Sequence, residues 1–199
     1  MPRDVDHDQR RREIVVAVWT IVARRGIEGV TLRGVAAEAG VSMGRVQHYF
    51  GTRDELVRHA CRLMVEGAQA EHAAQGEALP PVERLRLLVH RAVPTTPGFT
   101  RGVAVWTAFH AKSVDDPEIA TILADAHRGG ILEGAALVVE ARGRGDLPDG
   151  EDADALALRL LALAEGYGAR VLVGSLDAAD ALAALDREIG RIGGAPDAR

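Results

Sequence analysis

Apolar residues recur every three or four positions along most of the chain, and this spacing limits the possible folds more than any other feature. Near the N-terminus, Ile14, Val18, Ile21 and Val22 fall on one face of a helix. We find no runs of alternating apolar and polar residues bounded by hairpin turns, the pattern that indicates β-strands. The sequence therefore predicts an all-α protein.

Stop and capping residues divide this pattern into about nine helices. Gly26 and Gly40 end the first two helices, while Ser42 and Thr52 cap the third and fourth. We expect helices over residues 8–25, 32–39, 43–49, 52–74, 81–93, 98–113, 116–144, 151–174 and 177–192. The stretch "AAQGEALPP", residues 73–81, has two prolines, a glycine and no apolar period, so it is the best candidate linker. The predicted domains are 1–60, with its fourth helix continuing to about residue 74, and 75–199.

Composition excludes several classes of protein. With 199 residues, 47% of them hydrophobic, the chain has ample material for a core. Cys61 is the single cysteine, which rules out an intrachain disulfide and a thiolate-rich zinc site. Neither a secretory signal nor a membrane-spanning run is evident. We therefore expect a cytoplasmic protein with no membrane partner, no cofactor and no metal.

Charge is distributed unevenly along the chain. The formal net charge is −5, yet residues 9–62 contain ten arginines and five acidic residues, a local balance of +5. The chain beyond residue 62 is acidic. A basic module on an acidic body is expected when one end of a protein meets phosphate and the other does not.

The basic segment has the pattern of a helix-turn-helix. Two short helices are joined by Gly40, Val41 and Ser42, and Val46 and Phe50 anchor the second helix inward. The other side chains of that helix then project outward, and Gly44 leaves room for the helix to approach a groove. Arg45 matches the acceptors of guanine and Gln47 those of adenine. The side chains suited to phosphate oxygens are Ser42, His48, Tyr49 and Arg53.

Residues 13–61 resemble the DNA-binding domain of the TetR family of transcriptional regulators. The resemblance rests on "RRGIEGVTL", "VAAEAGVSMG" and "YFGTRDEL". It implies base contacts from Arg33, Met43, Arg45 and Gln47. It implies phosphate contacts from Thr31, Ser42, His48, Tyr49 and Arg53. Family members commonly carry tyrosine at position 47 and histidine at 49, so the exact division between base and phosphate contacts is left open here. Arg53 takes the place of a common lysine, which preserves the charge.

The remainder of the chain resembles the BetI group of that family, through "AVWTAFHAKSVDDPEIA" and "GDLPDGEDADALALRLLALAEGYG". Helix 151–174 is apolar nearly all round, and helix 177–192 carries an apolar stripe, so we expect these two helices to bury a second face in a homodimer. A monomer whose own core absorbs both faces is the alternative. The candidate interface residues are Leu158, Leu172, Leu182, Leu185 and Ile189.

Aromatic and polar side chains in the second domain suggest a ligand site. Trp106, Phe109 and His110 share one helix face, and Glu165 and Tyr167 lie on the helix expected to oppose it. Ordinary core packing of Trp106 and Phe109 is an equal alternative.

These observations predict a DNA-binding transcriptional regulator, with a repressor favoured over an activator. A small-molecule inducer would release the dimer from a palindromic operator. A regulator without a ligand is the first alternative. A small helical enzyme using His110 and Glu165 is the second, although no nucleophile elbow, phosphate loop or metalloprotease motif accompanies them.

Overall fold

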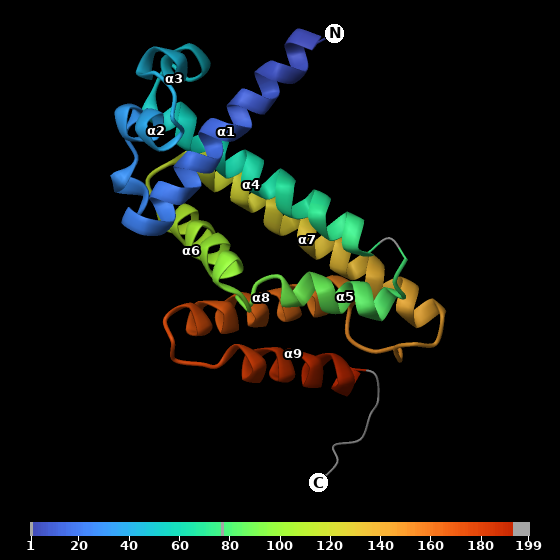
Figure 1. Ribbon diagram of the computed structural model, residues 1–199. Coiled ribbons are helices and arrows are strands. Elements are labelled where there is room, and N and C mark those ends of the chain that lie inside the picture. The colour runs from blue at the N-terminus through green and yellow to red at the C-terminus, as the bar shows by residue number, and fades with distance from the viewer. Residues whose placement is uncertain (1, 77, 193–199) are drawn as a thin grey trace. The chain divides into compact units, whose positions relative to one another are not determined.

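The computed structural model describes residues 2–76 and 78–192, and within these ranges all regular structure is helical (Figure 1). The predicted all-α fold is confirmed. No helix in the described part of the chain is long and apolar enough to span a membrane. The elements are α1 (Pro2–Arg25), the 3-10 helix η1 (Ile27–Gly29), α2 (Leu32–Glu38), α3 (Met43–Tyr49), α4 (Arg53–Gly76), α5 (Pro81–His90), α6 (Pro97–Lys112), α7 (Pro117–Gly143), α8 (Ala153–Leu172) and α9 (Ala178–Ile192).

One predicted boundary was clearly wrong, because α1 starts at Pro2 rather than at residue 8. The other helix ends fall within about three residues of the expected positions. Among these, α4 continues to Gly76, so the expected linker begins inside a helix, and α5 ends at His90 rather than at residue 93. Most of this agreement comes from side chains that satisfy the free N–H groups of a helix's first turn.

These N-terminal caps are visible along the chain. Thr31, Ser42 and Asp152 each accept a hydrogen bond from the backbone N–H three residues ahead. At the start of α4, the Glu55 N–H donates to Thr52 Oγ1 at 3.1 Å. The Glu55 carboxylate in turn accepts from the Gly51 N–H at 2.9 Å, one residue earlier than the usual capping box.

The described chain divides into two compact units. Unit 1 consists of residues 1–68 and 104–123, and unit 2 of residues 69–103 and 124–199. In unit 1, α2 packs against both α1 and α3. One apolar core joins this group to the later part of unit 1, since Phe50, Leu56 and Val18 share it with Phe109 and Ile119. The second half of α6 and the start of α7 therefore belong with the helix-turn-helix.

Unit 2 is a separate helical group with its own core. Helices α8 and α9 lie side by side, and α5 packs on both of them (Figure 1). Leu85 and Leu88 of α5 meet Leu156 and Leu160 of α8 in this core. Leu137 and Val138 of α7 belong to the same cluster.

Candidate nucleic-acid interface

The turn between α2 and α3 has a backbone that favours glycine. Gly40 has φ +65°, in the left-handed region that other residues rarely adopt. The next residue, Val41, donates its N–H to the Ala36 carbonyl oxygen at 3.0 Å and packs half-buried against the unit 1 core. The tight turn fixes the angle at which α3 leaves α2.

Buried side chains on the inner faces of α2 and α3 anchor the two short helices in the unit 1 core. Val35, Ala36, Val46 and Phe50 are each at most 4% exposed. At the helix starts, the Gly34 N–H donates to Thr31 Oγ1 at 3.0 Å, and the Arg45 N–H donates to Ser42 Oγ at 3.2 Å. Each hydroxyl thus acts as an acceptor within the chain, and its hydrogen remains able to donate to a phosphate oxygen.

The outward face of α2 and α3 is polar and open. Arg33, Arg45 and Gln47 are exposed, and in the described part of the chain their side chains make no hydrogen bond or ion pair. A Cβ at Gly44 would meet no atom within 4 Å, so the fold itself does not require glycine there. The predicted residues that are exposed on this face are Thr31, Arg33, Ser42, Met43, Gly44, Arg45, Gln47 and His48. Tyr49 is half-buried, with its ring edge-on to the His48 ring at 5.5 Å.

Arg53, which the resemblance assigns to phosphate, also makes hydrogen bonds within unit 1. Its Nε donates to the Val30 carbonyl oxygen at 2.8 Å, and a terminal nitrogen donates to the Ile27 carbonyl oxygen at 2.8 Å. The other terminal nitrogen donates to the Asp54 carboxylate at 3.2 Å. Arg53 thus ties the start of α4 to the loop before α2, and its contact with phosphate stays a prediction.

An ion-pair cluster that the sequence did not reveal joins α4 to the start of α7 within unit 1. Arg58 Nε lies 3.1 and 3.0 Å from the two Asp116 carboxylate oxygens, and an Arg58 terminal nitrogen lies 2.6 Å from Glu118. Asp116 also accepts from the N–H groups of Glu118 and Ile119, which makes it the N-cap of α7. The partners are 58 and 60 residues apart, so no local pattern marks them.

The predicted ligand residues are distributed over both units. Trp106 and His110 stack edge-on at 4.6 Å in unit 1, and His110 Nδ1 lies 3.1 Å from the Trp106 carbonyl oxygen. Phe109 is fully buried in the unit 1 core, as the core-packing alternative expects, and its contact with a ligand stays a prediction.

The other two predicted ligand residues belong to unit 2. Tyr167 packs against the unit 2 core. Glu165 is exposed and lies 3.3 Å from His127 Nε2. That carboxylate accepts a hydrogen bond from the imidazole and raises the pKa of His127, although burial opposes the shift.

The predicted interface residues differ in how far they are buried within the subunit. Leu185 and Ile189 are at most 2% exposed and belong to the core of unit 2, so they are not available to a partner and their assignment was wrong. Leu182 is half-buried against the same core, and Leu172 is half-buried at the end of α8. Leu158 is 54% exposed.

Comparisons with known proteins agree with this geometry. Residues 14–60 match the family model described as bacterial regulatory proteins, tetR family. Residues 81–194 match the model described as BetI-type transcriptional repressor, C-terminal. Together the two models cover most of the chain.

Individual relatives are similar over different lengths. The HTH-type transcriptional regulator PksA of Bacillus subtilis is 34% identical over 87% of this chain and 83% of its own length. BetI of Brucella melitensis is 34% identical over 58% of this chain and 60% of its own length. Among solved structures, a transcriptional regulator from Saccharomonospora viridis in complex with choline is 28% identical, with a TM-score of 0.84 over 92% of this chain and 96% of that one.

The matched families and relatives are transcriptional regulators, which sets aside the enzyme built on His110 and Glu165. The family resemblance inferred from the motifs of α2 and α3 is confirmed. The chain belongs to the TetR family of bacterial transcriptional regulators.

Proposed function

We propose that this protein is a repressor that binds a palindromic operator as a homodimer and leaves it when a small molecule binds. The observation that carries the proposal is the outward face of α3. Arg45 and Gln47 are exposed there and have no partner in the described chain, on a helix whose opposite face is buried through Val46 and Phe50. The family match supports the regulatory role. Such a protein acts where the chromosome lies, in the bacterial cytoplasm.

The proposed division of DNA contacts follows from side-chain chemistry. Arg45 suits the O6 and N7 acceptors of guanine, and Gln47 suits adenine. Arg33 and Met43 lie on the same outward face and are assigned to base edges. Thr31, Ser42, His48 and Tyr49 are assigned to phosphate oxygens, because their hydroxyl or imidazole groups can donate a hydrogen bond to an anion.

The proposed dimer is formed by the outer faces of α8 and α9. Leu158 is a large apolar residue left exposed on α8, and two copies of this helix pair would form a four-helix bundle. A two-fold symmetric dimer presents two reading helices, which is why a palindromic operator is expected.

The proposed effector is a small organic cation. The relative from Saccharomonospora viridis was crystallised with choline, and unit 2 of this chain carries two carboxylates beside a half-buried arginine. Burial lowers the pKa of Arg91, and the charges of Glu133 and Glu165 oppose that shift. Glu165 lies 3.3 Å from His127 Nε2 and Glu133 lies 3.2 Å from His72 Nε2, so a cationic ligand would share these carboxylates with the two imidazoles. A regulator without a ligand remains the alternative, and it predicts that no small molecule changes operator affinity.

The test begins by selecting bound sequences from a random duplex library with the full-length protein. We expect a palindrome with half-sites about one helical turn apart. Arg45→Ala should then lose about 1–3 kcal/mol of operator affinity and relax the preference at one position of each half-site. Arg101→Ala, an exposed arginine of α6 with the same loss of charge, is the matched control.

Two outcomes would contradict the proposal. Equal affinities of Arg45→Ala and Arg101→Ala for the selected operator would remove α3 as the reading helix. Choline added to the complex tests the effector class, because an inducer must bind the DNA-free form more tightly. Release of DNA is expected, and unchanged affinity at saturating choline would exclude this cation as the effector.

A further inference from the structure

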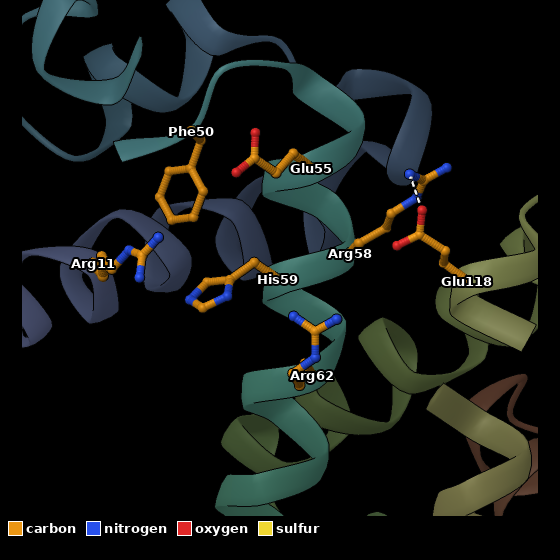
Figure 2. A pocket seen from close by; sticks show the side chains of 7 residues that line it. All are labelled: Arg11, Phe50, Glu55, Arg58, His59, Arg62 and Glu118. Carbon is orange, nitrogen blue, oxygen red and sulfur yellow. Dashed lines mark hydrogen bonds and ion pairs between the residues drawn. The ribbon is translucent and has the colours of Figure 1, made fainter. Parts of the chain in front are cut away.

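Unit 1 contains a surface cleft of about 490 Å³ that the DNA-reading face does not use. Arg11 of α1, Phe50 at the end of α3, four residues of α4 and Glu118 at the start of α7 line it (Figure 2). Figure 2 shows the Arg11 and His59 side chains close to the Phe50 ring, with the Arg62 guanidinium below them and the Arg58–Glu118 pair on the other side.

The two carboxylates of the cleft already have partners. Glu118 is paired with Arg58 at 2.6 Å, and Arg58 is further held by Asp116. Glu55 accepts the Gly51 N–H as part of the α4 cap. Arg58 balances the charge of Glu118, whereas Glu55 keeps its charge, so the lining as a whole has three arginines against two carboxylates.

Two cations of the cleft have no such partner. Among the described residues, Arg11 and Arg62 form no ion pair and no side-chain hydrogen bond. The Arg11 guanidinium lies over the Phe50 ring, 5.5 Å from its centroid, and its Nε is buried without a hydrogen-bond acceptor. Because that Nε is shielded from the cleft, an anion from outside would be bound by the terminal guanidinium nitrogens, which have no partner among the described residues.

We propose that this cleft binds a phosphate-type oxyanion between the guanidinium groups of Arg11 and Arg62. Guanidinium groups suit tetrahedral oxyanions because they donate several hydrogen bonds in a plane. Such an anion would contact α1, the end of α3 and α4 at the same time, and would therefore restrict the motion of α3 relative to α1 and α4. The oxyanion could be a backbone phosphate of bound DNA or a free phosphate-bearing molecule, and the experiment separates these two sources.

His59 makes the proposed site sensitive to pH. Burial lowers the pKa of His59, and the positive charges of Arg11 and Arg62 lower it further, while Glu66 and Glu55 oppose the shift. The imidazole is thus neutral at pH 7 in the absence of an anion. A bound oxyanion favours the protonated form, so it should raise the pKa of His59.

The test uses the full-length protein and inorganic phosphate as the probe, at constant ionic strength set with chloride. The variants are Arg11→Gln and Arg62→Gln, and the control is Arg12→Gln, an exposed arginine of the same helix that does not line the cleft. Calorimetry measures phosphate affinity, and NMR titration of the His59 imidazole reports its pKa. Arg62 is exposed and makes no hydrogen bond or ion pair with the described residues, so Arg62→Gln keeps the test valid if Arg11→Gln fails to fold.

Each result is decisive. Phosphate binding that raises the pKa of His59, and that falls at least ten-fold in Arg62→Gln but not in Arg12→Gln, identifies a site for a free oxyanion. No phosphate binding, with a salt dependence of DNA affinity reduced by about one unit in Arg62→Gln alone, identifies a DNA phosphate. If neither occurs, or if Arg62→Gln and Arg12→Gln lose affinity equally, the proposal is overturned. The DNA arm rests on the proposed operator binding, which Arg45→Ala tests separately, whereas the phosphate arm does not.

Discussion

Gly168 of α8 lies against the backbone of the segment that follows α5. A Cβ built at this position would overlap the Ala92 carbonyl oxygen, which is backbone and cannot rotate away. Gly168 is buried next to the apolar core that contains Leu160 and Ala164. The glycine is therefore needed for close packing of two chain segments within unit 2, rather than for an unusual φ angle.

We predict that Gly168→Ala lowers the free energy of unfolding by about 1–3 kcal/mol, because the new methyl group forces α8 away from Ala92. Gly166→Ala on the same helix is the control. A Cβ there meets only the flexible end of Arg170, at 3.6 Å, and alanine is favoured over glycine in a helix by about 0.5–1 kcal/mol. Urea denaturation followed by circular dichroism measures both variants. Equal free energies of unfolding for Gly168→Ala and the wild type would show that α8 can move away from Ala92 at no cost.

At the scale of a helix, the first turn of α7 is stabilised by Asp116. This residue precedes Pro117, accepts two backbone N–H groups of α7 and receives the Arg58 guanidinium of α4. Burial raises the pKa of the Asp116 carboxyl, but the hydrogen bonds from Arg58, Ile119 and Glu118 outweigh burial and hold that pKa below the ordinary value of 3.8. The ionised form is the one that stabilises unit 1.

We predict that Asp116→Ala lowers the free energy of unfolding by about 1 kcal/mol through loss of the cap alone. Asp116→Asn should recover the cap but not the ion pair. Because the pKa of Asp116 is lower in the folded state, its contribution is complete above pH 3.8 and is lost as the pH falls through the folded pKa. The difference in the free energy of unfolding between the wild type and Asp116→Asn should therefore decrease at acidic pH. Asp115→Ala, which removes an exposed neighbour that pairs with Lys112 in the described part of the chain, is the control for urea titrations, and an equal loss of stability in Asp115→Ala would contradict this role.

The helices that could be predicted from the sequence are those whose ends are set by neighbouring residues. Thr31, Ser42 and Thr52 act on backbone groups within three residues, and Gly40 acts on its own φ angle, so the helix-turn-helix and its exposed face follow from local chemistry. Arg53 could not be predicted in this way. Its acceptors at Val30 and Ile27 are more than twenty residues earlier, and an arginine beside the reading helix looks the same whether it binds phosphate or carbonyl oxygens.

The same limit applies to the last helix. The apolar stripe of α9 was predicted correctly as a buried face. The sequence alone does not show whether Leu185 is buried inside one subunit or between two subunits, because both kinds of burial require apolar residues. The structure shows that α5 and α8 of the same chain cover this stripe. The surface that a second copy would cover must therefore be sought on the outer side of the helix pair.

At the scale of the whole molecule, the proposed dimer depends on that outer side. Leu158 on α8 is 54% exposed, whereas Leu185 on α9 is fully buried. Because one leucine is exposed and the other is buried, substitutions at the two positions can test dimer assembly and subunit folding separately. A change at the exposed leucine acts on assembly, and a change at the buried one acts on the fold.

We predict that Leu158→Glu produces a folded monomer, because an unpaired carboxylate is costly in an apolar interface. Leu132→Glu is the matched control, since Leu132 is 66% exposed on α7 and its substitution should leave the dimer intact. Leu185→Glu should instead unfold unit 2. Sedimentation velocity at micromolar concentration gives the oligomeric state, and circular dichroism confirms folding. The Leu158→Glu monomer should bind a full palindrome hardly better than a half-site, because the second reading helix no longer contributes. A wild-type protein that sediments as a monomer, or a Leu158→Glu variant that remains a dimer, would exclude this interface.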